Sequence, residues 1–145
     1  MTNYDPWRDA AERHPDVHIE RCETAPASGA WVPSERVIFV GDHLDRAGRR
    51  STLAHELAHV DLDHRPTGHR WFDRRAERDA DDLAAGRLIA LDELVDALLV
   101  HPLHPTRVAD ELEVQGRILK RRLGLLTEAE KDYVEARLAE REHVA

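Results

Sequence analysis

Two histidines stand four residues apart in the run STLAHELAHVDLDH, residues 51–64, and a glutamate directly follows the first of them. On a helix, His55 and His59 lie one turn apart on one face, so both imidazoles can reach a single metal ion. Glu56 lies about 100° round the helix from His55 and can reach water bound to that ion. The pattern predicts zinc ligands at His55 and His59, with Glu56 as the group that takes a proton from the water.

The same residues also suit an ordinary amphipathic helix whose polar side chains face solvent. A third ligand separates the two interpretations, because a catalytic zinc ion keeps three protein ligands and one open position. Downstream, Glu77 and Asp81 are again four residues apart. We expect Glu77 to complete the ligand set and Asp81 to accept the free N–H of a ligating histidine. Four nearby residues are rivals for the third ligand: His64, His69, Asp73 and Asp79.

Beyond these single residues, the chain resembles the ImmA/IrrE family of metallopeptidases. The family pattern joins an HELxH helix to a downstream Glu-x-x-Ala-Asp/Asn, small residues and a Leu-Leu/Ile-x-Pro end. Roughly residues 37–91 carry the resemblance, with the motifs HELAH at 55–59, ERDAD at 77–81 and AAGRLIA at 84–90. The chain departs from the pattern at Ala90, where proline is usual, and has Asp79 where an acid is frequent but not fixed.

The resemblance implies a peptidase with one zinc ion, held by His55, His59 and Glu77, and with Glu56 as catalytic acid/base. Members of the family cleave helix-turn-helix repressors, so it also implies a repressor as the protein substrate and the release of repressed genes. Some relatives regulate without demonstrable proteolysis, which leaves a second possibility: a regulator that binds and inactivates a repressor without cutting it.

The composition fits one soluble domain. The chain has 145 residues, a net charge of −8 and a single cysteine, Cys22, which cannot form an internal disulfide. No apolar run is long enough for a signal peptide or a membrane span, so we expect a cytoplasmic protein without a membrane partner. The acidic balance disfavours nucleic acid as a partner. The expected domain, residues 1–145, has three parts: an N-terminal helix and sheet (1–47), active-site helices (48–100) and C-terminal helices (101–145).

The expected fold class is α+β, with a small antiparallel sheet of about three strands packed on the metal-binding helix. Asp5 and Pro6 predict the start of a first helix, because aspartate caps helices and proline fits their first position. Strands are expected at residues 17–23, 30–33 and 36–40. The last of these, Arg36–Val40, could offer a free edge to an extended substrate.

From Gly48 the sequence predicts helices almost to its end. The metal-binding helix is expected over about residues 49–64 and the next over about 71–90, with an apolar stripe of Phe72, Ala76, Ala80, Leu83 and Ile89. Asp92 is expected to cap a third helix, and Thr127 with Glu130 a capping box on the last. An oxyanion would need a further donor, for which the sequence offers His64, His69, His101, His104 and Tyr133.

Residues 105–126 have the pattern of a helix-turn-helix, which makes DNA binding the less favoured alternative. The expected core residues are Val108, Leu112, Val114, Ile118 and Leu123. The expected exposed cations are Arg117, Lys120, Arg121 and Arg122. Acidic neighbours offset this charge, so a solvated helix pair is the simpler interpretation.

Overall fold

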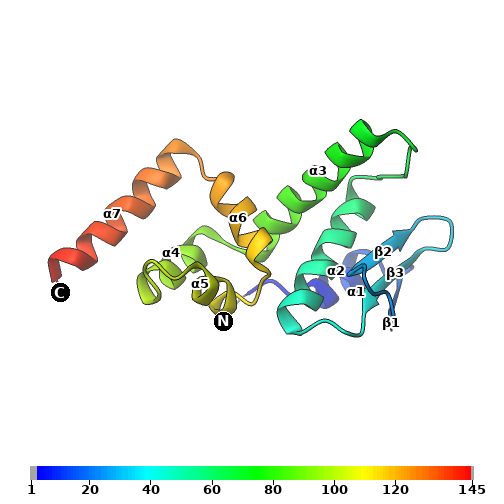
Figure 1. Cartoon of the computed structure of the whole chain (residues 1–145), viewed down its shortest axis with the longest axis horizontal. Helices are drawn as coiled ribbons and strands as arrows, with labels where there is room; N and C mark the ends of the chain where they lie inside the picture. The colour runs from blue at the N-terminus through cyan, green and yellow to red at the C-terminus, as the bar shows by residue number, and fades with distance from the viewer. Residues whose placement is uncertain (1–2, 145) are drawn as a thin grey trace.

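The computed structural model describes residues 3–144 and has an α+β fold, with the sheet at one end and the C-terminal helices at the other (Figure 1). Its strands are β1 (His18–Cys22), β2 (Gly29–Val32) and β3 (Val37–Gly41). Its helices are α1 (Pro6–Arg13), α2 (Arg46–Asp61), α3 (Arg70–Leu88), α4 (Leu91–Val100), α5 (Pro105–Glu111), α6 (Gly116–Gly124) and α7 (Glu128–Val144). No helix among these described residues is both long and apolar enough to cross a membrane.

The sheet is mixed, with strand order β1-β3-β2. β2 pairs with β3 antiparallel, as expected, whereas β1 pairs with β3 in parallel, so the expectation of an all-antiparallel sheet was wrong. β3 is the most apolar strand, and its Ile38 and Val40 are fully buried. A strand of that composition is stabilised best in the middle of the sheet, with neighbours on both sides. Residues 37–40 are therefore not an edge, and β2 is the strand beside α2 that has a free side.

α2 crosses the interior between the sheet and α3. It begins at Arg46, earlier than expected, because Asp45 caps it by accepting the N–H of Gly48 at 2.8 Å. On one side Leu53 and Leu57 pack in a cluster with Ile38 and Val40 of β3. On the other side Ala54 joins the cluster formed by α3 and the later helices. Packing on both sides fixes the direction in which the polar face of α2 points.

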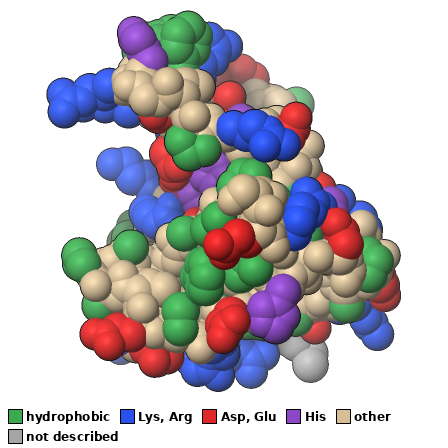
Figure 2. Space-filling view, turned by 90° about the vertical axis from the view of Figure 1, so that its right-hand side faces the viewer, with side chains coloured by type: hydrophobic (Ala, Val, Ile, Leu, Met, Phe, Trp, Pro, Cys, Tyr) green, Lys and Arg blue, Asp and Glu red, His purple; other side chains and the backbone are tan. Residues whose placement is uncertain are grey.

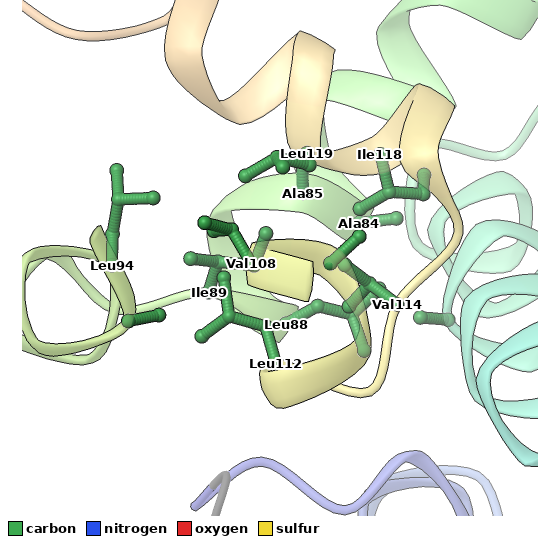
Figure 3. Packing of buried hydrophobic residues seen from close by; sticks show 13 residues of the cluster. Ala84, Ala85, Leu88, Ile89, Leu94, Val108, Leu112, Val114, Ile118 and Leu119 are labelled. Atoms are coloured by element: carbon green, nitrogen blue, oxygen red, sulfur yellow. The ribbon is translucent and has the colours of Figure 1, made fainter. Parts of the chain in front are cut away.

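The second apolar cluster joins the end of α3 to α4, α5 and α6 (Figure 3). Four of the five core residues expected in this region are buried: Val108, Leu112, Val114 and Ile118. Leu123 is exposed and Arg122 is buried, both contrary to expectation. At 100° per residue, Arg122 shares the inner face of α6 with Ile118. Leu123 lies about 140° round the helix from Ile118. The Nε–H of Arg122 donates to the carbonyl oxygen of Ile89 at 2.7 Å.

Two of the three predicted helix caps are present. Asp5 accepts the N–H groups of Trp7 and Arg8 at the start of α1, and Thr127 and Glu130 exchange hydrogen bonds of 3.1 and 3.0 Å before α7, which confirms both predicted caps. Asp92 is not a cap, because α4 begins at Leu91 and Asp92 lies inside its first turn.

The start of α3 extends past the body of the molecule (Figure 1). Phe72, expected in the apolar stripe of this helix, is 54% exposed for that reason, while Ala80 further along is fully buried.

Candidate metal centre

α2 brings two imidazoles together inside the protein. The Nε2 atoms of His55 and His59 are 3.1 Å apart, and each side chain is only 10% exposed. The four-residue spacing sets this approach, since one helical turn stacks the two side chains on the face that looks toward α3.

Glu77 reaches the same point from α3. Its Oε2 lies 2.9 Å from Nε2 of His55 and its Oε1 lies 3.0 Å from Nε2 of His59. Within residues 3–144, one ligand atom from each of these three side chains falls within 4.8 Å of the others. Two ligand atoms of a tetrahedral zinc ion, each 2.0–2.1 Å from it, stand about 3.3 Å apart. The spacing of the three side chains therefore suits a single ion.

The outward nitrogens of the two histidines also have partners. Nδ1 of His55 lies 2.7 Å from Oδ1 of Asp81, and Nδ1 of His59 lies 2.9 Å from Nδ1 of His64. When each Nδ1 carries the proton, both Nε2 atoms present lone pairs toward the carboxylate of Glu77. Three acceptor groups about 3 Å apart repel one another unless a cation lies between them. The donor set thus fits a divalent metal ion.

The electrostatics of the centre favour positive charge. Burial opposes protonation of His55, but the carboxylates of Asp81 and Glu77 outweigh it and raise the pKa of His55 to about 9. Hydrogen bonds with His55 and His59 hold the pKa of Glu77 well below its usual range. Both carboxylates are therefore ionised at neutral pH, and the site attracts a proton or a metal cation.

Glu56 lies beside this group, on the wall of the same cleft as His59 and Glu77. It is 7% exposed, and burial raises its pKa, while a hydrogen bond from the backbone of Trp31 and the nearby histidines act in the opposite direction. A carboxylate whose basicity is increased in this way is suited to accepting a proton from water.

The centre opens on one side into a cleft of about 380 Å³ between β2, α2 and α3. The Glu77 side chain is 62% exposed, in contrast to the buried histidines. In the space-filling view onto the sheet end of the molecule, the surface is hollowed below its upper lobe, and histidine and acidic side chains are visible there (Figure 2). A catalytic metal needs an open side of this kind for water and substrate.

β2 borders the cleft with backbone groups that the sheet does not use. The N–H of Gly41 donates to the carbonyl of Ser28 at 2.7 Å, which makes this facing pair a hydrogen-bonded one. Bonded and non-bonded pairs alternate along an antiparallel ladder, so Ala30 bonds to β3. Gly29 and Trp31 therefore direct their backbone groups to the free edge, on the cleft side.

The rivals for the third ligand do not join the three grouped side chains. Asp73 accepts hydrogen bonds from the backbone and the hydroxyl of Thr67, and His64 contacts the outer nitrogen of His59. His69 and Asp79 are not among the three grouped ligands. Of the five oxyanion candidates, only His64 is among the described residues that line the cleft.

Sequence reasoning missed two features of the site. One is the role of β2 as the wall of the cleft, and the other is Arg117, whose guanidinium donates to the carboxylate of Asp81. Strand order carries no local sequence signal. Arg117, in turn, is one of three arginines in the same short helix, so its position in the sequence did not single it out.

Comparison with protein families gives one finding. The family model of the M78 peptidases, described as the IrrE N-terminal-like domain, matches residues 11–124. The match includes all three motifs, confirms the resemblance drawn from them, and ends at the last residue of α6. A search of curated proteins found no match.

Proposed function

Because the chain belongs to the family of IrrE N-terminal-like domains, we propose that it is a zinc-dependent endopeptidase that cleaves a helix-turn-helix repressor. The observation that carries the proposal is the convergence of His55, His59 and Glu77 beside the buried Glu56. The repressor as substrate rests on the resemblance of the three motifs to those of the ImmA/IrrE metallopeptidases.

In this proposal His55, His59 and Glu77 hold the ion. Two imidazoles and one carboxylate are a donor set typical of catalytic zinc. When bound, zinc supplies a Lewis acid that lowers the pKa of a water molecule toward ~7 and polarises a carbonyl group. Asp81 accepts the Nδ1–H of His55 and so keeps the Nε2 lone pair directed into the site.

Glu56 moves the protons of the reaction. Its carboxylate accepts a proton from the water that attacks the peptide carbonyl, and then donates that proton to the nitrogen of the leaving amine. Burial favours the first of these steps, because a raised pKa makes the carboxylate a better base.

The substrate binds along β2. Gly29 and Trp31 direct backbone groups that do not bond to β3 toward the cleft side of the strand, where an extended peptide can add as a further strand. Recognition through the backbone places the scissile bond next to Glu56, whose carboxylate already lies near the backbone of Trp31. Such binding requires an extended or locally unfolded segment in the repressor.

Glu56→Gln tests the proposal. The variant keeps the shape of the side chain and all three metal ligands, so it should fold and bind zinc as the wild type does. Loss of a general base lowers the rate by about 10²–10⁴-fold. The assay incubates the purified zinc-loaded chain with helix-turn-helix repressors from its own cell and identifies cleavage products by mass spectrometry. If Glu56→Gln still inactivates the repressor in cells, the regulator that binds without cutting is the better explanation.

The structure offers little support for DNA binding by α5 and α6. Arg117 and Arg121 are paired with Asp81 and Asp82 of α3, and Arg122 is buried. α6 packs against α3 with the face that carries these arginines. Their charges are therefore already engaged within the chain, and DNA would have to displace the two aspartates.

A further inference from the structure

We infer that Arg117 of α6 is a positioning residue for the metal centre, acting on the ligand His55 through Asp81. The inference rests on the metal site of the proposed function and extends it to a helix that contributes no ligand. It also gives the C-terminal half of the chain a part in the site.

The contacts form a continuous chain from α6 to the ligand. Oδ1 of Asp81 accepts from Nδ1 of His55 at 2.7 Å and also from the guanidinium of Arg117. The side chain of Asp81 is 21% exposed, that of His55 10% and that of Arg117 46%. Arg117 thus covers the solvent-facing side of the partly buried Asp81 carboxylate. The buried imidazole of His55 contacts the same carboxylate from the interior.

Arg117 acts on the orientation of Asp81. The same carboxylate oxygen accepts hydrogen bonds from both His55 and Arg117. A carboxylate held by a single hydrogen bond can turn about its side-chain torsions, whereas a guanidinium on the same oxygen fixes it. A fixed acceptor keeps the proton of His55 on Nδ1 and the lone pair of Nε2 in the site.

A purely structural role is the competing explanation, because Arg117 and Asp81 also join α6 to α3. The chain contains a matched pair that makes the same connection. Arg121 lies one turn after Arg117 on α6, and its Nε–H donates at 2.7 Å to Oδ1 of Asp82, the residue next to Asp81. The two arginines are exposed to a similar degree, 46% and 38%. Asp81 also contacts His55, whereas Asp82 has Arg121 as its one hydrogen-bond partner among the residues that the structure describes.

The experiment compares the zinc affinity of Arg117→Ala and Arg121→Ala with that of the full-length wild type, by competition with a chromophoric chelator. Loss of a residue that supports a zinc ligand weakens binding by about 10–100-fold, which we expect for Asp81→Ala. Because Arg117 acts one step further out, we expect a loss of about tenfold, at the lower end of that range, for Arg117→Ala. Arg121→Ala should stay within about twofold of wild type, and Arg117→Lys should recover part of the loss.

A double-mutant cycle supplies the decisive comparison. If Arg117 acts through Asp81, the double variant Asp81→Ala/Arg117→Ala binds zinc as weakly as Asp81→Ala alone. Thermal unfolding of each variant shows whether the fold is kept, and Arg117→Gln replaces Arg117→Ala if the latter does not fold.

Each outcome bears on the inference. Equal zinc affinities of Arg117→Ala and Arg121→Ala, or additive losses in the cycle, would overturn it and leave Arg117 as a link between helices. Failure of the wild type to bind zinc would overturn both the inference and the proposed function. Zinc binding that depends on Arg117, without cleavage of any repressor, would support the inference while the peptidase proposal fails.

Discussion

Glu77→Ala should abolish the stabilisation of this chain by zinc, because it removes the ligand that joins α3 to the two histidines of α2. In the wild type the ion would bridge two helices that also pack through their apolar faces. An ion that binds the folded state alone stabilises it by an amount that grows with the logarithm of its concentration relative to its dissociation constant. The variant retains His55 and His59, which alone form a weaker site.

The size of the effect follows from the length of the chain. Zinc at 100 times its dissociation constant stabilises the folded state by about 2.7 kcal/mol. At about 2.1 cal/mol/K per residue, unfolding of 145 residues has an entropy of about 0.3 kcal/mol/K. The wild type should therefore melt about 9 °C higher with zinc than with a chelator. Loss of a ligand should weaken affinity by at least about 100-fold, which at the same zinc concentration leaves a shift of about 1 °C.

Thermal unfolding followed by circular dichroism measures both shifts, with each protein compared to its own metal-free form. Asp79→Ala is the matched control, because Asp79 is an exposed acid on the same helix and was a rival for the third ligand. It should keep the full shift of the wild type. If Glu77→Ala keeps that shift, or Asp79→Ala loses it, the ligand set argued from the geometry is wrong.

Three further predictions concern the elements that position the site. Asp61→Asn removes a partly buried carboxylate that forms ion pairs with Arg13 of α1 and Arg87 of α3. The substitution should lower the unfolding free energy by about 2 kcal/mol in urea titrations. Gly29→Ala should destabilise β2 by about 1–3 kcal/mol, because a Cβ there would stand 2.3 Å from a backbone oxygen of β3. The control Gly86→Ala has open space and should stabilise α3 by up to about 1 kcal/mol. The hydrogen bond from Arg13 lowers the pKa of Asp9 from 3.8, so its stabilising effect is complete above about pH 4 and is lost as the pH falls further. Unfolding titrations from pH 6 to pH 2 should show a smaller decrease in stability for Asp9→Asn than for the wild type.

Much of the candidate site could be predicted, because its residues stand four apart in the sequence and helical geometry then fixes how they lie. His55 and His59 must share a helix face whatever the rest of the fold does, and Glu77 with Asp81 repeats the same interval. The caps of α1 and α7 were predictable for the same reason, since a capping side chain bonds to backbone only two or three residues away.

Longer-range features were predicted less well. The residues of β3 identified a strand, but its apolar pattern did not show which strands flank it or in which direction they run. Phe72 and Leu123 were expected in the core from helical periodicity, yet both are exposed, because periodicity does not show where a helix extends past its partners.

The sequence alone determined which side chains can act as ligand, base and supporting acid, since helical geometry fixes how residues four apart are placed. Only the tertiary structure decided that Glu77 meets the histidines of α2, that β2 forms the wall of the cleft, and that Arg117 holds Asp81. These three contacts join segments 18 or more residues apart, and they depend on how the apolar faces of helices and sheet pack. That packing is a property of the whole chain, so no short stretch of it specifies these contacts.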